Sequence, residues 1–303
     1  MKYQDHYFEV ESGVQLRYLD EGTGPAILFV PGWCFSADVF VPLMETLTSS
    51  YRCIAVDPRC HGKSTVTYHG NRYDQQGRDL AALLEALKLK KAVLAGWSFG
   101  ALACWSYVRQ FGTQKVAGVV TFDNSPRSIS EDPLEYRAGT LEGLQSDHWG
   151  ALCTPEAFRS FMGGFADGLL YEGQMAPELR QELIESACRV PFEVADQLYM
   201  DGWLADERKT VHLLDETVPS LLLIANYRKD PGEAYMRKQY PHTEIHAFGM
   251  HMMFHEYVSK TSQILIAFLH EKIGETDAEW TKSVLLMPRL HSCREHTARD
   301  SLP

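Results

Sequence analysis

The sequence predicts an α/β fold, a mostly parallel, doubly wound sheet with a helical cap insertion. Three observations predict it. Short continuous apolar runs recur along the chain, and helix-length stretches with apolar residues at three- and four-residue steps separate them. Between residues 126 and 217 this alternation stops, and good helix formers take over. Because such short apolar runs are typical of strands that helices cover on both faces, we expect the strands to be parallel.

The elements are expected in the following order. Residues 6–11 and 14–20 alternate apolar and polar side chains around Ser12-Gly13, which is typical of a solvent-faced antiparallel hairpin. The continuous apolar runs predict further strands at residues 26–30, 53–56, 92–95, 116–122, 220–225 and, more weakly, 243–248. The helical periodicity predicts helices at residues 74–87, 99–111 and 257–273.

This pattern predicts one core that is split in the sequence. Residues 1–125 and 218–273 would form the sheet and its covering helices, and residues 126–217 a helical cap over the carboxyl edge of the sheet. Many large apolar side chains in the cap segment should face its own core or a pocket. Residues 274–303 have mixed charge and no sustained periodicity, so we expect a loosely attached or disordered tail.

Composition limits the classes of partner. The chain has 303 residues and a net charge of −11, which argues against a nucleic-acid partner or an anionic membrane surface. No run approaches the roughly 18 apolar residues of a membrane span, and the N-terminus lacks the apolar segment of a signal peptide. The seven cysteines contain no C-x-x-C pair and are expected as free thiols. We expect a cytoplasmic protein with no metal site and no cofactor; no oligomeric state is predicted.

The strongest chemical signal is Gly96-Trp97-Ser98-Phe99-Gly100, between an expected strand and an expected helix. This is the G-x-S-x-G pattern in its required context. The turn from strand to helix is so sharp that the flanking glycines are needed to avoid steric clash. The serine is then exposed on a strained corner at the carboxyl edge of the sheet, next to a helix N-terminus. Ser98 is therefore the candidate nucleophile.

Two further loops should meet Ser98 at this edge. The turn Pro31-Gly32-Trp33-Cys34 leaves the strand expected at 26–30, so the backbone N–H of Trp33 and that of Phe99 could form an oxyanion hole. The loop after the strand expected at 53–56 carries His61 beside a glycine in a tight turn. A histidine in that setting more often satisfies backbone groups than performs catalysis.

These three elements in this order resemble the α/β-hydrolase superfamily, over about residues 6–273. In that family an acid and then a histidine follow the serine along the chain. His251, after the last expected strand and two residues after Gly249, matches the position of the family histidine. His255 is its rival, but Glu256 follows it, so the pair is not the H-E-x-x-H zinc motif.

The acid has two candidates. The family usually carries it in a Gly-x-x-Asp turn after the strand expected here at 220–225, but this chain has Asn226 for the glycine and Lys229 for the aspartate. Asp230 comes one residue late. Asp123, at the end of the strand expected at 116–122, holds a position that some hydrolase-fold enzymes use instead. We favour Asp123 because a strand end positions a carboxylate more rigidly than a loop does, and Asp230 stays open as the alternative.

The resemblance implies a serine hydrolase that cleaves small, mostly apolar carboxylic esters or lactones through an acyl-enzyme on Ser98. Phe35 and Trp97 should line an apolar substrate pocket. One alternative is a cofactor-free dioxygenase that cleaves a hydroxyquinolone-type heteroaromatic ring. Such enzymes are similar in the acid position and in the Pro-Gly-Trp-Cys turn, although they carry a histidine where this chain has Phe35. The other alternative is a non-catalytic, hydrolase-like ligand receptor.

Overall fold

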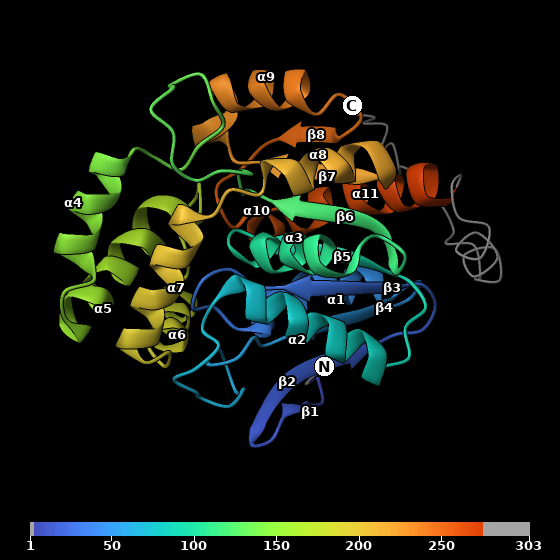
Figure 1. The fold of residues 1–303 in the computed structure, drawn as a ribbon, viewed down its shortest axis with the longest axis horizontal. Helices are drawn as coiled ribbons and strands as arrows, with labels where there is room; N and C mark the ends of the chain where they lie inside the picture. Colours follow the sequence, from blue (N-terminus) through green and yellow to red (C-terminus); the bar gives the residue numbers. More distant parts are fainter. Residues whose placement is uncertain (1–2, 275–303) are drawn as a thin grey trace, which may run out of the picture.

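The computed structural model describes residues 3–274, apart from the side chains of residues 147 and 149–151. Eight strands of this part form one sheet in the order β1-β2-β4-β3-β5-β6-β7-β8. The β1–β2 and β2–β4 pairs are antiparallel, and all the other pairs are parallel. Helices cover both faces (Figure 1). The predicted mostly parallel, doubly wound sheet is confirmed.

The strands lie where the alternation and the apolar runs predict them. The N-terminal hairpin consists of β1 (His6–Glu11) and β2 (Val14–Glu21). The other strands are β3 (Ala26–Val30), β4 (Arg52–Val56), β5 (Ala92–Trp97), β6 (Val116–Phe122), β7 (Ser220–Ile224) and β8 (Glu244–Ala247). Every residue of the three central strands β3, β5 and β6 is buried, as expected for strands with a helical layer on each face.

Two helical layers enclose the sheet. On one face α3 (Gly100–Phe111) contacts both α2 (Tyr73–Ala86) and α8 (Arg208–Thr217). On the other face α1 (Val41–Leu47) contacts α10 (Met253–Glu256) and α11 (Val258–Phe268) (Figure 1). Four shorter or peripheral segments complete the described core: η1 (Ala37–Phe40), η3 (Asn226–Arg228), α9 (Lys229–Gln239) and η4 (Leu269–Ile273), which continues α11. The helices predicted at 74–87, 99–111 and 257–273 correspond to α2, α3 and α11 with η4.

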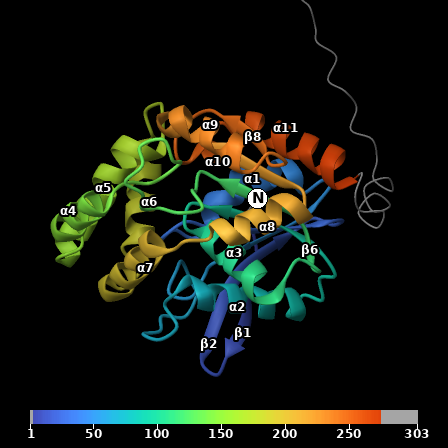
Figure 2. The same ribbon diagram turned by 45° about the horizontal axis from the view of Figure 1, so that its top comes forward.

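The segment predicted as a helical insertion is helical. Its elements are α4 (Leu141–Ala151), α5 (Pro155–Phe165), η2 (Ala166–Leu170), α6 (Pro177–Ala187), α7 (Phe192–Leu204) and α8. Helices α4 to α7 gather beyond the end of the sheet toward which β6 points (Figures 1 and 2), whereas α8 contacts α3. The indole of Trp33 donates to the carbonyl of Ala195 at 2.8 Å, which ties α7 to the turn after β3. The boundaries of the cap and core domains stay a prediction.

Two other expectations concern the chain as a whole. Six cysteines of the described residues are free, and Cys293 lies outside these residues with the predicted tail. Within residues 3–274, no helix combines the length and the apolar character that crossing a membrane requires.

Candidate active site

Ser98 lies on the turn between β5 and α3. Its φ is 51°, in the left-handed region that a residue with a Cβ occupies only at a cost. The Ser98 N–H donates to the carbonyl of Phe122 at 2.8 Å, which anchors this turn to the end of the neighbouring strand β6. The backbone therefore directs the Ser98 side chain into a cavity at the carboxyl edge of the sheet.

The two glycines beside Ser98 allow close backbone packing. A Cβ on Gly100 would lie 2.3 Å from the carbonyl oxygen of Val30 and 2.4 Å from that of Pro31. A Cβ on Gly96 would lie 2.5 Å from the backbone nitrogen of Ala101. These contacts are with rigid backbone, so no side-chain movement could relieve them. The G-x-S-x-G pattern thus reflects the close approach of β3, β5 and α3.

We predict that Gly100→Ala destabilises the protein by about 1 to 3 kcal/mol, because the added methyl must displace the chain after β3. Urea unfolding measures the change. Gly164→Ala is the matched control, since a Cβ there meets nothing within 4 Å and Gly164 lies inside α5. The control should be as stable as the wild type or more stable by about 0.5 to 1 kcal/mol. Equal stability of Gly100→Ala and the wild type would contradict this packing argument.

The turn after β3 packs directly against Ser98. A Cβ on Gly32 would lie 3.0 Å from the Cβ of Ser98, and Cys34 has a φ of 66°. Trp33 and Phe99 both line the cavity that Ser98 faces. Within the described residues, neither the N–H of Trp33 nor that of Phe99 donates a hydrogen bond to another protein group. Both N–H groups are thus available to an oxygen bound beside Ser98.

His251 follows β8 and lines the same cavity as Ser98. Its Nδ1 lies 2.6 Å from Oδ2 of Asp123, at the end of β6. The His251 N–H donates to the carbonyl of Leu169 at 3.0 Å, and the Trp97 indole donates to the carbonyl of His251 at 2.7 Å. No hydrogen bond joins Ser98 and His251 within the described residues; such bonds commonly tighten only when substrate binds. The ring is thereby fixed between the carboxylate and the cavity.

Asp123 is fully buried, and each of its carboxylate oxygens accepts two hydrogen bonds. Oδ2 accepts one from the ring of His251 and one from the Tyr227 hydroxyl, at 2.7 Å. Oδ1 accepts one from the Tyr136 hydroxyl at 2.9 Å and one from the Ala225 N–H at 3.1 Å. A φ of 48° places Asp123, like Ser98, in the left-handed region. The carboxylate is thus held rigidly although it is far from solvent.

The charge state of Asp123 follows from these contacts. Burial by itself would raise the pKa of the carboxyl. The hydrogen bond from His251 and the positive charge of Arg228 outweigh burial and hold the pKa of Asp123 well below its usual range. Asp123 is therefore an ionised carboxylate at neutral pH, as orienting and stabilising a charged imidazole requires.

The cavity over Ser98 has a volume of about 640 Å³. Much of its wall is aromatic: Trp33, Phe35, Trp97, Phe161, Phe165 and Tyr199. The ring centroids of Phe35 and Trp97 lie 4.9 Å apart, and so do those of Trp33 and Tyr199. Rings from the turn after β3, from the end of β5 and from α5 and α7 thus line one cavity.

The comparisons agree with this architecture. The family model described as the alpha/beta hydrolase fold matches residues 25–166. The AB hydrolase superfamily protein YisY of Bacillus subtilis (strain 168) is 35% identical over 42% of this chain and 48% of its own length. The bromoperoxidase from Bacillus anthracis superposes with a TM-score of 0.80 and 20% identity, over 88% of this chain and all of that one. The chain has the α/β-hydrolase fold.

Other proteins that are similar to this chain carry several activity names. An esterase from Exiguobacterium antarcticum superposes with a TM-score of 0.77 and 19% identity, over 88% of this chain and 99% of that one. Further similar proteins are named as an esterase/perhydrolase, an enol-lactonase, haloperoxidases and an epoxide hydrolase. The chain spans about half the length of the curated relatives that it matches first. These names leave the substrate of this chain open.

The alternative acid, Asp230, has a different position in this α/β-hydrolase fold. It is exposed, lies near the start of α9 and lines the cavity, but the His251 Nδ1 contacts Asp123 instead. Sequence reasoning missed three residues of this cluster: Tyr136, Tyr227 and Arg228. One signal could have indicated Tyr227 and Arg228, namely the departure from the Gly-x-x-Asp turn at residues 226–230.

His255, the rival of His251, does not line the cavity. Its Nδ1 contacts the hydroxyl of Tyr171, and the neighbouring Glu256 accepts the N–H groups of Glu172 and Gly173. His255 and Glu256 thus tie α10 to the chain after η2. Within residues 3–274, no group of three or more His, Cys, Asp or Glu side chains could hold a metal ion.

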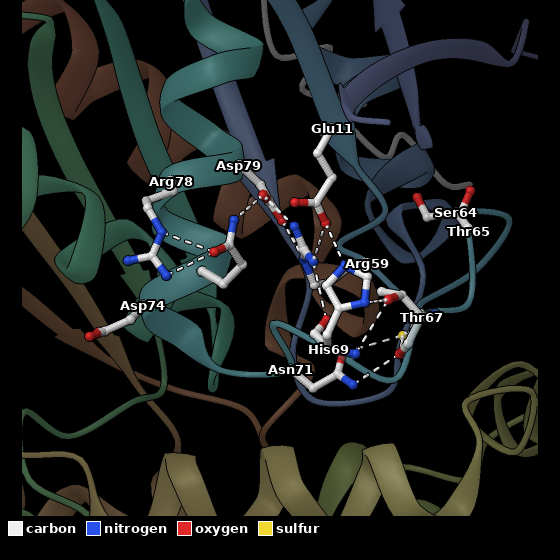
Figure 3. A network of polar contacts seen from close by, with 12 residues as sticks. Glu11, Arg59, Ser64, Thr65, Thr67, His69, Asn71, Asp74, Arg78 and Asp79 are labelled. Atoms are coloured by element: carbon white, nitrogen blue, oxygen red, sulfur yellow. Dashed lines mark hydrogen bonds and ion pairs between the residues drawn. The ribbon is translucent and has the colours of Figure 1, made fainter. Parts of the chain in front are cut away.

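His61 supports the turn that carries Trp33. Its Nε2 accepts the N–H of Cys34 at 3.0 Å, so its Nδ1 bears the proton and donates to the carbonyl of Arg59 at 2.9 Å. Burial lowers the pKa of His61 to about 4, which keeps the ring neutral at physiological pH. Arg59 is in turn clamped between Asp79, at 2.8 Å, and Glu11, at 3.1 Å (Figure 3). His61 therefore satisfies backbone groups, and does so beside the candidate oxyanion donor.

We predict that His61→Ala lowers kcat for an ester about tenfold with a smaller change in KM, because the turn that carries the Trp33 N–H loses its anchor. The unfolding free energy should fall by about 1 to 3 kcal/mol, since the Cys34 N–H is left buried without an acceptor. His69→Ala, on the same loop but exposed, is the control for steady-state kinetics and urea unfolding. Wild-type kcat in His61→Ala would refute the anchoring role.

Proposed function

We propose that this chain is a serine hydrolase that cleaves small, mostly apolar carboxylic esters or lactones. One observation carries the proposal. A single cavity is lined by Ser98, on its strained turn, and by His251, whose Nδ1 contacts the ionised carboxylate of Asp123. A nucleophile, a base and an orienting acid on three different loops are the arrangement that acyl transfer needs.

In the proposed mechanism, Nε2 of neutral His251 takes the proton of the Ser98 hydroxyl while the oxygen attacks the carbonyl carbon. Asp123 orients the ring and stabilises the imidazolium that forms. The N–H groups of Trp33 and Phe99 donate to the oxyanion. His251 then returns the proton to the leaving alcohol oxygen, and the acyl group stays on Ser98. Water, activated by the same histidine, attacks the acyl-enzyme and releases the acid.

The cavity supports an uncharged substrate of modest size. Its aromatic wall suits an apolar acyl or alkoxy group, and about 640 Å³ is within the range of small-molecule sites. Among the lining residues, the charges of Arg137 and Arg228 are balanced by those of Asp230 and Glu135, so the lining as a whole favours no anionic or cationic ligand. The proposed partner is therefore a small ester or lactone, and similar proteins named as esterases and as an enol-lactonase support this class.

The test combines turnover with labelling. Aryl acetates, butyrates and octanoates, together with five- and six-membered lactones, would be assayed by release of phenol or acid. A fluorophosphonate would then be added, and its adduct located by peptide mass spectrometry. We expect hydrolysis of the shorter esters and one adduct on Ser98. No turnover across the panel, with no adduct on Ser98, would overturn the proposal.

The two alternatives give different results in the same assays. A ligand receptor would bind members of the panel without turnover and without an adduct on Ser98. A dioxygenase would consume oxygen and release carbon monoxide with a hydroxyquinolone. The apolar ring of Phe35, packed on Trp97, offers no hydrogen bond to such a heteroaromatic ligand. For this reason we favour the ester hydrolase.

A further inference from the structure

Two tyrosines and an arginine surround the carboxylate that His251 contacts. The Tyr227 hydroxyl donates to Oδ2 of Asp123 at 2.7 Å, and the Tyr136 hydroxyl donates to Oδ1 at 2.9 Å. The guanidinium of Arg228 lies 5.1 Å from the ring centroid of Tyr227 and 6.0 Å from that of Tyr136. The simple acid–histidine pair is thus part of a larger polar cluster.

The two tyrosines have different relations to His251. Tyr227 donates to Oδ2, the same oxygen that the His251 ring contacts, and its hydroxyl oxygen lies 3.2 Å from Nδ1 of His251. Tyr136 donates to the other oxygen, which does not contact the ring. The side chains differ in exposure, since Tyr136 is buried and Tyr227 is 38% exposed. Each hydroxyl donates to one oxygen of the same carboxylate, so removing them one at a time compares the oxygen that contacts the ring with the one that does not.

The position of Tyr227 and Arg228 in the chain is informative. Both lie in η3 (Asn226–Arg228), directly after β7, where the sequence departs from the usual Gly-x-x-Asp turn. The loop expected to carry the acid therefore carries a hydroxyl donor and a positive charge instead. The Tyr227 hydroxyl donates to Asp123, and the charge of Arg228 acts on the same carboxylate. Asp123 itself follows the neighbouring strand β6.

We propose that Tyr227 and Arg228 are positioning residues that limit how strongly Asp123 stabilises the protonated form of His251. A second donor on Oδ2 withdraws charge from the oxygen that faces the ring, and a nearby guanidinium opposes a second positive charge. Removing either group should therefore let Asp123 hold a protonated ring more strongly, and the experiments below measure this change. This inference rests on the proposed function, in which His251 is the base.

Several other charged or titratable groups face the same space. They are Ser98 on the β5–α3 turn, Glu135 and Arg137 on the chain before α4, and Asp230 on α9. Within the described residues, none of them makes an ion pair or a side-chain hydrogen bond with His251. Direct contact with the Asp123–His251 pair thus distinguishes Tyr227 from these groups.

The test compares the Tyr227→Phe and Tyr136→Phe variants, each of which removes one hydroxyl from Asp123. For Tyr227→Phe, the acidic limb of the pH profile of kcat/KM should move up by about half to one pH unit. Tyr136→Phe should give less than half that shift. Tyr68→Phe, an exposed tyrosine, controls for the substitution itself. A purely structural role would lower kcat without moving the limb.

A direct titration separates this inference from the proposed function. The ring of His251 would be followed by NMR against pH in the wild type and both variants, with His251→Gln to assign its signal. If Tyr227→Phe titrates like the wild type, the inference is overturned whatever the activity. If the shift appears but no ester is hydrolysed, the proposed function fails and the positioning role stands. If Tyr227→Phe folds poorly, Arg228 provides the test instead. Arg228→Met, which removes the positive charge, must then raise the midpoint of the His251 titration more than Arg228→Lys, which keeps it.

Discussion

Ser98→Ala should lower ester hydrolysis by on the order of a million-fold, to the level that binding and the oxyanion donors alone support. The reason is geometric. The left-handed turn projects one hydroxyl into the cavity that His251 lines, and alanine keeps the backbone of that turn while removing the attacking oxygen. Steady-state assays with an aryl acetate measure the loss, and the fluorophosphonate adduct should disappear with it.

The matched control is Ser106→Ala. Ser106 lies on the same helix α3, and its hydroxyl donates to Asp74 at 3.2 Å, so it belongs to the α2–α3 contact and does not line the cavity. Its variant should keep at least half of the wild-type kcat. Retention of more than about one per cent of activity in a folded Ser98→Ala variant would show that Ser98 is not the nucleophile.

The backbone of this site was predictable from local sequence signals. The run at 92–95, the glycines at 96 and 100 and the helical periodicity after them each predict a sharp strand-to-helix turn at Ser98. The structure adds the steric reason, which is the 2.3 Å approach that a Cβ on Gly100 would make to the carbonyl oxygen of Val30, at the end of β3. This turn can be predicted from the sequence because it depends on a few adjacent residues and on the parallel pairing of β3 with β5.

The cluster around Asp123 could not be derived in this way. Tyr136 reaches Asp123 from the chain before α4, and Tyr227 reaches it from the loop after β7, 104 residues along the chain. No periodicity or local motif relates these positions; only the packing of the two loops against the end of β6 brings them together. Similarly, no feature of residues 126–217 predicts that Ala195 accepts the indole N–H of Trp33. Helical propensity predicts a helix, but tertiary contacts decide its partners.

The same cluster makes Asp123→Asn the substitution with the second-largest expected effect. An amide at this position carries no charge, and its nitrogen cannot accept the two hydrogen bonds of the oxygen that it replaces, whereas both Oδ1 and Oδ2 of Asp123 are acceptors now. The ring would lose both its orientation and the partner that stabilises its charged form. We expect kcat for an aryl acetate to fall by about 10⁴-fold. Asp230→Asn, which removes the charge of the exposed candidate acid, should change kcat less than threefold. A larger loss of kcat in Asp230→Asn than in Asp123→Asn would make Asp230 the acid.

Stability provides a second measure of the Asp123 cluster. Removing its charge leaves Arg228 without its nearby buried carboxylate, so Asp123→Asn should lower the unfolding free energy at pH 7 by about 3 kcal/mol. Because the pKa of Asp123 is lowered in the folded state, its contribution is present above the unfolded value of about 3.9 and is lost as the pH falls toward the folded value. Urea unfolding should therefore show the gap between wild type and variant narrowing below about pH 4. A gap that is constant with pH would mean that the charge of Asp123 contributes nothing to folding.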